Sequence, residues 1–428
     1  MIATGDPEYP GFADRLIRTG LVADPWCDGA PRFDRRPVFL SASAARAMAR
    51  AAAEVALAID EAVRLAAEHP ACLDDFFGLT ATQKLMFAVS APLWHGLARA
   101  DVFTCADGSL QICELNSDTP SGLAETTALA TTLGASDRRR GLDPSARLAP
   151  TFVTMVRRAA ADLGVRGRAP RVGIVYPTEL TEDFGQIALW QRLFAAEGWP
   201  VALGSPFNLA WTSEGRLTLL GQPCDVVIRH YKTDWWGERR PVWSDEPVFV
   251  DPEPLVGPLS AILAAVDRGL CAVVNPFGAV LTQNKRMMAF LWERLDDLSP
   301  AARAAVRTFI PFSTRLETAN PQRLRDERDA WVLKSDYGCE GDEVVIGDDV
   351  TDAVWDEALR AALPGRWIAQ RRFVPAADAE GRIANHGVYL VAGEPAGIYT
   401  RLSRGATDAR AVSVPTLVGD GDAEEMAS

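Results

Sequence analysis

Polar side chains gather at two short apolar runs that read as the strands of a hairpin. Arg99 and Asp101 lie in the first run, and Glu114 and Asn116 close the second. Because side chains alternate along a strand, each pair shares one face. Carboxylate and amide oxygens are the ligands that Mg²⁺ prefers, and an arginine beside them can contact a phosphoryl group. The spacing predicts a magnesium site with Asp101, Glu114 and Asn116 as ligands, while a solvent-facing hairpin accounts for the same residues equally well.

A second set of candidates is basic. Lys285 stands near the start of a predicted helix, and Lys334 ends a predicted strand that leads into a loop with Gly338 and Gly341. A lysine beside a glycine-bearing loop can hold phosphates, with the loop amides as further donors. Arg401, at the end of another predicted strand, could bind a carboxylate or phosphate through two parallel hydrogen bonds. Taken singly, each of these residues is as typical, or more typical, of an exposed surface.

The bulk composition bounds the class of protein. The chain has 428 residues, of which 48% are apolar, so it can bury a large core in two or three domains. Its net charge of −13 argues against a nucleic-acid binder. The scattered cysteines form no CxxC pair, and neither a leader nor a membrane-spanning run is present, which predicts a cytoplasmic protein with reduced thiols. The motifs GxxxxGK[ST], HExxH and GxSxG are absent.

The elements that must position these residues follow from the apolar periodicity. Ser41 is the expected N-cap of a long helix that ends near His69, because apolar residues recur every three or four positions. Asp107-Gly108 is a typical hairpin turn. Further expected elements are an irregular segment over 1–40, a helix over 81–97, hairpin strands over 100–104 and 110–115, a helix over 126–133 and a charged loop over 136–144.

From residue 170 the pattern changes to alternating strands and helices, which is typical of a parallel α/β unit. No GxGxxG follows its first strand, so a dinucleotide-binding fold is unsupported. Expected strands are 171–176, 201–203, 225–230 and 271–275, with helices over 184–197, 255–266 and 283–294. Short strands are expected at 331–334, 343–346, 367–370, 388–391 and 397–401, and a disordered acidic tail from Gly419.

Taken in order, these clusters resemble the glutathionylspermidine synthase family of ATP-grasp ligases. The segment Cys113–Glu125 is similar to the family pattern E-x-N-x-D-T-P-[TS]-x-x-x-E, which is quite specific. The other matches are weaker singly but keep the family order from about residue 95 to 403. They are Arg99-Ala-Asp101 for R-x-D, Thr282-Gln-Asn-Lys285 for S-N-K, Trp331–Lys334 for the K-P strand, Trp367–Gln370 for Y-I-x-Q and Ala396–Arg401 for A-G-x-x-x-R.

The resemblance implies an α/β (α+β) architecture, namely an ATP-grasp fold in the family's permuted order with an inserted Rossmann-like pre-ATP-grasp domain. The implied divisions are an N-terminal helical segment with the metal-binding hairpin over 1–150, the α/β substrate domain over 151–280, the nucleotide-binding lobes with a glycine-loop lid over 281–418, and the tail over 419–428.

The resemblance also implies a role for each candidate residue, with ATP and Mg²⁺ as cofactors. One arginine would stabilise the transferring phosphoryl group and another would hold the activated carboxylate. The implied sites are catalytic Arg99 and Arg401; ATP-binding Lys285, Lys334, Gly338, Gly341 and Gln370; metal-binding Asp101, Glu114, Asn116 and Glu340; and substrate-binding Ser121 and Glu182.

The implied activity is ADP-forming ligation through an acyl phosphate, which joins a peptide or amino-acid carboxylate to an amine such as a polyamine. The sequence departs from the family at Ser335, where the family has proline, and at Cys339, where it has arginine. We also expect no amidase domain, for which the length leaves no room. Neither substrate is therefore named, and the oligomeric state, a homodimer included, is left open. A regulatory or scaffolding ATP-binding protein and a small-molecule kinase are the alternatives.

Overall fold

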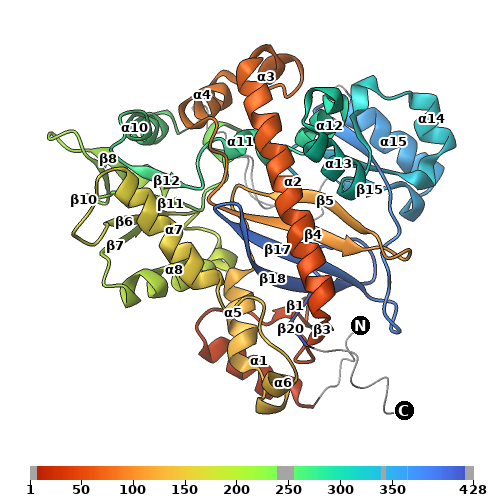
Figure 1. Ribbon diagram of the computed structural model, residues 1–428, viewed down its shortest axis with the longest axis horizontal. Helices are drawn as coiled ribbons and strands as arrows, with labels where there is room; N and C mark the ends of the chain where they lie inside the picture. Colours follow the sequence, from red (N-terminus) through yellow and green to blue (C-terminus); the bar gives the residue numbers. More distant parts are fainter. Residues whose placement is uncertain (1–6, 239–254, 339–343, 364, 420–428) are drawn as a thin grey trace.

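The centre of the molecule is a five-stranded antiparallel sheet (Figure 1). The computed structural model describes residues 7–238, 255–338, 344–363 and 365–419. The strand order is β19 (Val412–Val414), β18 (Glu394–Ser403), β17 (Ile383–Val391), β4 (Leu97–Thr104), β5 (Leu110–Asn116). The expected turn at Asp107-Gly108 joins β4 to β5, and Gly108 has the positive φ that such a turn requires. The hairpin prediction is confirmed.

Helix α2 (Ala42–Glu68) crosses this sheet and covers one of its faces (Figure 1). The Ser41 side chain accepts a hydrogen bond from the Ala44 N–H, as an N-cap does. The buried stripe of α2 is rich in alanine, with Val55 and Ile59 fully buried, so the helix can lie close to the strands. The predicted long helix is confirmed within one residue at each end.

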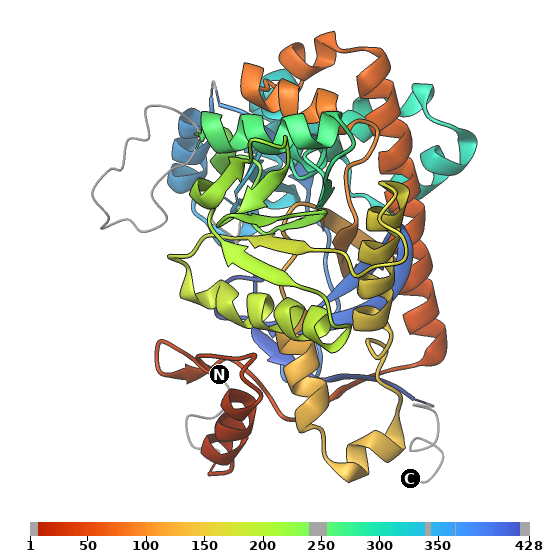
Figure 2. The ribbon, with the colours of Figure 1, turned by 90° about the vertical axis from the view of Figure 1, so that its left-hand side faces the viewer.

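A second, parallel sheet has the order β12 (Ala272–Val274), β11 (Val226–Arg229), β6 (Val172–Val175), β7 (Val201–Gly204). Figure 2 shows α8 (Phe184–Ala196) and α10 (Val256–Asp267) on opposite sides of these strands. Val227 packs in the apolar core with α10, whereas Val226 and Ile228 pack with α7 (Leu148–Asp162) and α8. Both faces are thus buried, which explains the continuous apolar runs of these strands. The strands predicted for this unit, and its helices over 184–197 and 255–266, are confirmed.

A third sheet has the order β13 (Ser313–Arg315), β16 (Trp367–Arg371), β14 (Trp331–Ser335), β15 (Val344–Ile346). Its own apolar cluster includes Trp331, Leu333, Trp355 and Leu359. The helices of this part of the chain are α12 (Arg286–Glu293), α13 (Pro300–Phe309), α14 (Pro321–Asp326) and α15 (Asp352–Ala362).

Several short elements complete the chain. They are β1 (Trp26–Cys27), β2 (Ala30–Pro31), β3 (Val38–Leu40), α3 (Ala71–Asp75), α4 (Ala81–Ser90), α5 (Leu123–Thr132), β8 (Leu209–Trp211), β9 (Leu217–Leu219), β10 (Gln222–Pro223), α9 (Trp235–Glu238), α11 (Ala279–Thr282) and β20 (Thr416–Val418). β20 pairs with β3 in parallel, which brings described residues near both ends of the chain together.

Two segments expected to be irregular are helical. The expectation for residues 1–40 was wrong in part, because α1 (Tyr9–Arg18) buries Phe12 and Leu16 in the core. The charged loop expected over 136–144 was also wrong, because it contains α6 (Ala135–Arg140). Arg138 donates to the Ala130 and Thr131 carbonyls at the end of α5, so this arginine satisfies a helix C-terminus.

Two expected helices are shorter than predicted, one at its end and one at its start. The helix over 81–97 was too long, because α4 stops at Ser90 before Ala91-Pro92, and a proline disfavours helical backbone in the residue before it. The helix over 283–294 begins only at Arg286, whose N–H donates to the Asn284 side chain. Lys285 therefore lies in the break between α11 and α12. The acidic tail from Gly419 lies outside the described residues, apart from Gly419 itself.

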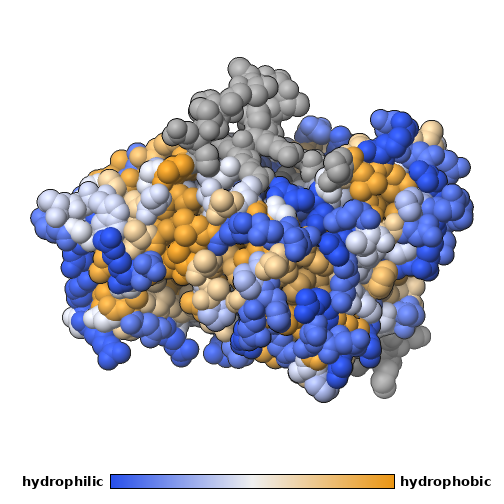
Figure 3. Space-filling view, turned by 90° about the horizontal axis from the view of Figure 1, so that it is seen from above, coloured by the Kyte–Doolittle hydropathy of each residue, from blue (hydrophilic) through white to orange (hydrophobic). Residues whose placement is uncertain are grey.

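The molecular surface mixes polar and apolar side chains. Figure 3, the view from above, shows apolar side chains gathered on the face where Figure 1 places α4 and α10. Leu85 and Val256, on these two helices, are more than half exposed. Scattered exposed apolar residues of this kind are usual on folded proteins. In the described part of the chain, no helix has the length and hydropathy needed to cross a bilayer.

Candidate active site

The polar residues of the hairpin lie on one face of the central sheet. Arg99 on β4 pairs with Asn116 on β5, and paired residues point to the same side. The Arg99 Nε donates to Oδ1 of Asp101 at 3.0 Å, and the Asn116 amide donates to Glu114 at 3.3 Å. Each predicted pair therefore shares a face. The strand register shifts around Asp101, and such bulges re-aim side chains beside functional sites.

Asp101 is held between two guanidinium groups. Arg99 contacts Oδ1, while Arg401 donates to Oδ2 at 2.9 Å from strand β18. Asn385 on β17 donates to the same Oδ2 at 3.0 Å. Burial alone raises the pKa of a carboxyl, but the two arginines outweigh it and hold the pKa of Asp101 below its usual value. Asp101 is thus a charged carboxylate although it is almost completely buried.

The path of Arg99 depends on a glycine in the neighbouring strand. A Cβ at Gly387 on β17 would lie 2.6 Å from Cδ of Arg99, so only a glycine leaves room for this side chain. Beyond that contact, Arg99 donates to the Ser121 carbonyl at 2.8 Å, and the Tyr389 hydroxyl donates to the same carbonyl at 2.7 Å. The backbone of Ser121 is therefore fixed, while its side chain is exposed.

A lysine reaches Glu114 from the break between α11 and α12. Lys285 is buried, and its ammonium lies 3.7 Å from Glu114 and contacts the Gly338 carbonyl. Its own N–H donates to the Asp336 carbonyl at 2.8 Å. Lys285 therefore links β5, which carries the predicted metal ligand Glu114, to Gly338 at the start of the predicted glycine loop.

Lys334 and Gln370 converge on the residue before Glu114. Lys334 on β14 donates to the Cys113 carbonyl at 3.4 Å, and Gln370 on β16 lies 3.5 Å from the same oxygen. Gln370 also donates to the Ser313 hydroxyl at 3.0 Å. Burial raises the pKa of the Cys113 thiol to about 11, so this thiol stays neutral. The third sheet thus touches β5 where the two predicted ATP contacts lie.

Lysine is rare in this chain, which makes these positions informative. The sequence has four lysines among its 44 basic residues, and two of the four are Lys285 and Lys334. Arginine replaces lysine readily on a surface, but the ammonium group is a compact point charge that suits a phosphate. Both lysines are at least nine-tenths buried in a chain whose other cations are nearly all arginine.

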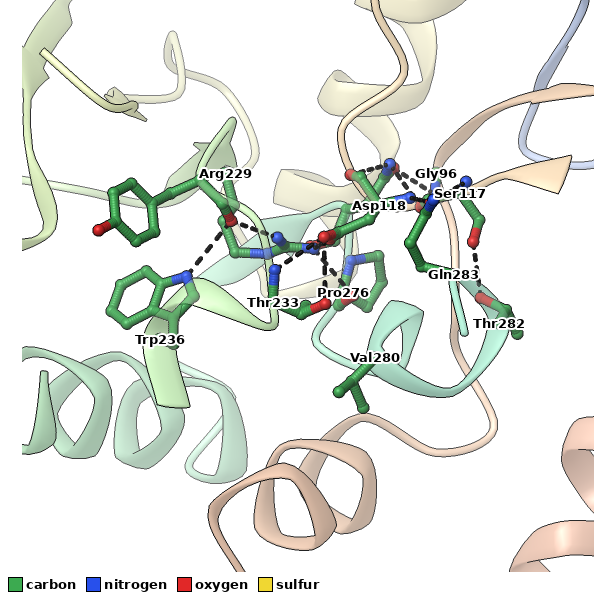
Figure 4. Close-up of polar contacts among 12 residues, drawn as sticks. Gly96, Ser117, Asp118, Arg229, Thr233, Trp236, Pro276, Val280, Thr282 and Gln283 are labelled. Atoms are coloured by element: carbon green, nitrogen blue, oxygen red, sulfur yellow. Dashed lines mark hydrogen bonds and ion pairs between the residues drawn. The ribbon is translucent and has the colours of Figure 1, made fainter. Parts of the chain in front are cut away.

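The stretch after Asn116 is held from the second sheet (Figure 4). Arg229, at the end of β11, lies 2.6 Å from Oδ1 of Asp118, and the Thr233 N–H donates to Oδ2 at 2.7 Å. Asn275, just after β12, donates to the Ser117 and Asp118 carbonyls at 2.9 and 2.8 Å. Residues at the ends of β11 and β12 therefore fix the loop that follows β5.

The donor set suits a hard cation bound together with phosphates. Asp101, Glu114 and Asn116 offer two carboxylates and an amide oxygen on one face, and Mg²⁺ prefers oxygen ligands of these kinds. Across 7–238 and the other described ranges, no three His, Cys, Asp or Glu side chains form a metal cluster. A cation here would depend on the amide and on phosphate oxygens, and the adjacent lysines could hold those phosphates.

Not all predicted residues come together. Arg99, Asp101 and Arg401 form one contact group, and Glu114, Asn116, Lys285 and Gly338 form another beside Lys334 and Gln370. Glu182 is exposed in the short turn Thr181–Asp183 before α8, on the side of the parallel sheet. Glu340 and Gly341 fall outside the described residues.

Sequence reasoning missed several residues that support the site. Asp118 and Gln283 lie inside matched motifs but received no role, and Asn275 appeared only as the end of a predicted strand. Asn385 carried no local signal, because its partner Asp101 is far away in the sequence. One clue was available for Asp118: it sits inside the most specific motif of the chain.

Fold and site together define a mixed α/β protein with a cluster of buried charged residues on its central antiparallel sheet. The chain belongs to the glutathionylspermidine synthase preATP-grasp family, whose model matches residues 9–419. The resemblance seen in the motifs is thereby confirmed.

Solved structures resemble the chain at low sequence identity. A glutathione synthetase-like effector from Globodera pallida has a TM-score of 0.56 and 12% identity, over 96% of this chain and 96% of that one. A putative gamma-glutamylcysteine synthetase from Methylobacillus flagellatus has a TM-score of 0.46 and 13% identity, over 82% and 83%. A RimK domain ATP-grasp protein from Sphaerobacter thermophilus has a TM-score of 0.30 and 18% identity, over 57% and 89%. A comparison with curated proteins gives no match.

Proposed function

We propose that this protein is an ATP-dependent carboxylate–amine ligase that works through an acyl phosphate and releases ADP and phosphate. The observation that carries the proposal is the state of Arg401. It shares Asp101 with Arg99, yet its buried Nε has no hydrogen-bond partner among the described residues. A buried donor without an acceptor is costly, and a substrate carboxylate or phosphoryl oxygen would supply one. Family membership and the glutathione synthetase-like fold support amide formation as the reaction class.

The nucleotide would lie against the third sheet. Lys285 and Lys334 would hold its phosphates, with amides of Gly338 and Gly341 as further donors. Gln370, on β16 with its side chain toward β5, would meet the adenine edge. Asp101, Glu114 and Asn116 would hold Mg²⁺, with Glu340 as a further carboxylate. When bound, Mg²⁺ would neutralise charge that develops on the phosphates during transfer.

The chain's own residues account for the chemistry of two displacements. In the first, a substrate carboxylate oxygen attacks the γ-phosphorus, the bond to the bridging oxygen breaks, and ADP leaves. Arg99 stabilises the phosphoryl oxygens, and Arg401 holds the carboxylate in line. In the second, the amine nitrogen attacks the carbonyl carbon, loses a proton, and expels phosphate. Asp101 keeps both guanidinium groups in place throughout, because it is charged and buried between them.

The substrates would enter at the end of the parallel sheet. From β6 the chain connects to β7 on one side and later to β11 on the other, and ligands bind outside the carboxyl ends of strands at such a switch. His230 contacts Asp183 there at 3.1 Å, next to Glu182. Gln186 on α8 is buried, and neither polar atom of its amide has a partner among the described residues. These carboxylates favour an amine, and Ser121 would contact the carboxylate substrate.

The permuted ATP-grasp order and the divisions at 150, 280 and 418 are part of this proposal. The central sheet supports the permuted order, since β4 pairs with β17 from the far end of the chain and β5 follows β4 at the sheet edge. The separate apolar cluster around Trp331 and Trp355 supports a nucleotide lobe of its own.

The nucleotide products test the reaction class. The protein is incubated with Mg²⁺, ATP and pairs of amino acids or short peptides with amines, polyamines included. We expect ADP and phosphate in proportion to the amide formed. For a productive pair, ¹⁸O from the substrate carboxylate should appear in the phosphate. AMP with pyrophosphate, or phosphate without the label, would contradict the acyl phosphate.

A further inference from the structure

A set of side chains outside the proposed ligand contacts converges on the two residues that follow Asn116. We propose that Gln283 and Asn275 are positioning residues that fix the Ser117–Asp118 backbone. Through it they would set where the metal ligand Asn116 lies relative to the phosphate contact Lys285. The identity of the ligand rests on the proposed function, whereas the contacts themselves do not.

Gln283 binds the N–H groups of this backbone. Its Oε1 accepts the N–H groups of both Ser117 and Asp118, at 3.0 and 3.1 Å. The neighbouring Thr282 hydroxyl lies 2.7 Å from the Ser117 hydroxyl. Gln283 is two residues before Lys285, in the same break between α11 and α12. The short turn between α11 and α12 therefore does two things. It binds the residues that follow β5, and it contains Lys285, whose ammonium lies near Glu114.

Asn275 binds the carbonyl groups of the same backbone. Its amide nitrogen donates to the Ser117 and Asp118 carbonyls, and to that of Leu97 at 2.7 Å. Its Oδ1 accepts the N–H groups of Gly96 and Leu97 at 2.8 and 2.7 Å. Asn275 thus ties the start of β4, two residues before Arg99, to the end of β5.

The Asp118 side chain gives the segment a third anchor. Asp118 and Arg229 are both buried and form an ion pair at 2.6 Å, as Figure 4 shows with Thr233 and Gln283 beside them. The backbone N–H and C=O groups of the segment and this side chain are thus all engaged by groups from the α/β unit and α11. A loop held at so many points transmits any displacement directly to Asn116.

Partners one step removed from a metal set its ligands' orientation, and losing one typically costs about 10- to 100-fold in metal affinity or activity. Gln283 can be tested without disrupting the fold, since it lies at the end of a short helix and is only partly buried. Asn275, with five hydrogen bonds, is the riskier position, because an unpaired buried amide could prevent folding.

The experiment compares Gln283→Met, Gln283→Glu and the wild type in the full chain. Methionine keeps the length of the side chain and removes the acceptor, whereas glutamate keeps an acceptor for both N–H groups. The matched control is Asn320→Leu, because the Asn320 Oδ1 accepts two backbone N–H groups at the start of α14, at 2.9 and 3.3 Å. Each variant is measured by calorimetry with Mg²⁺ and a non-hydrolysable ATP analogue, and by thermal unfolding.

We expect Gln283→Met to bind the analogue about tenfold or more weakly. Gln283→Glu should retain clearly more affinity than the methionine variant. Asn320→Leu should lose thermal stability without losing affinity. Wild-type affinity in Gln283→Met, or equal losses in both Gln283 variants, would overturn the positioning role alone. A wild-type protein that does not bind the analogue at all would instead overturn the proposed function, and this inference with it.

Discussion

Arg401 on β18 reaches Asp101 on β4 across the strand that lies between them. The guanidinium donates to the carboxylate at 2.9 Å, although 300 residues separate the two in the sequence. Strand β17 permits this contact because it offers Gly387 opposite Asp101 and Asn385 opposite Arg401. One carboxylate therefore sets the position of both arginines that the proposed reaction needs, with Arg99 on its other oxygen.

Arg401→Lys should show whether turnover depends on the positive charge at this position or on the planar guanidinium group. A lysine keeps the positive charge near Asp101 but cannot offer the planar fork that holds a carboxylate. Because such donors act mainly on the transition state, we expect kcat to fall about 100-fold or more. Steady-state ADP release measures the effect. Arg404→Ala, an exposed arginine just beyond β18, serves as the control and should keep normal turnover.

Gly387→Ala should disable the site by displacing Arg99. The added Cβ would lie 2.6 Å from Cδ of Arg99, so the guanidinium must leave Asp101 and the Ser121 carbonyl. We expect ADP formation to fall at least about 100-fold, since small misplacements at a reacting centre have effects of that size. Gly11→Ala in α1 is the matched control, where no other side chain crowds the added methyl. If Gly387→Ala retained full activity, Arg99 would not act from its present position.

Local chemistry made much of this arrangement predictable from the sequence. The hairpin, the strands of the parallel unit and the long helix from Ser41 follow from alternation, turn residues and capping. Asp101 and Glu114 stood out because alternation placed each of them on one strand face with a second polar residue, Arg99 or Asn116. The predictions failed where the structure depends on polar side-chain contacts, which apolar periodicity does not report. The run around Arg138 looked like a loop, yet its arginine satisfies carbonyls at the end of α5.

The polar partners of the site could not be found in the same way. Asn385 acts from the neighbouring strand of the same sheet, whereas Arg229 and Asn275 act between two sheets, and their sequence neighbours do not indicate these contacts. The break before Arg286 was missed for a related reason. A side chain at Asn284 competes with the helix for the Arg286 N–H, and apolar periodicity does not report such competition.

Both site lysines should contribute to nucleotide affinity. Lys285→Met and Lys334→Met each remove one charge proposed to lie on the phosphates, so KM for ATP should rise about tenfold or more. Lys84→Met is the control, because that lysine is partly exposed and forms an ion pair with Asp74 on the surface, away from the site. ATP titrations of initial rates provide the measurement. An unchanged KM in both site variants would place the phosphates elsewhere.

Stability should fall on mild acidification because of a buried histidine. Burial lowers the pKa of His386 to about 4 from its usual 6.5. Between these values the unfolded chain binds a proton that the folded chain does not, so the free energy of unfolding decreases as the pH falls, by at most about 1.4 kcal/mol per pH unit for one group. Below the folded pKa this contribution no longer changes.

His386→Asn removes that titration and leaves the similarly buried His95, whose pKa is also lowered to about 4. Urea unfolding of both proteins, at several values between about pH 7 and pH 4.5, gives the comparison. The wild type should lose stability more steeply than the variant. Parallel curves would mean that His386 accepts its proton in the folded protein as readily as in the unfolded chain.

The most direct test of the central claim is ATP turnover by Glu114→Gln. Glu114 is partly exposed and contacts only Lys285 and Asn116 among the described residues, so the substitution should leave thermal unfolding unchanged. It removes a charge that the proposed metal site needs, and ADP formation should fall at least about 100-fold below the wild type. A folded Glu114→Gln protein that forms ADP at a near-normal rate would contradict the assignment of this face to Mg²⁺ and ATP.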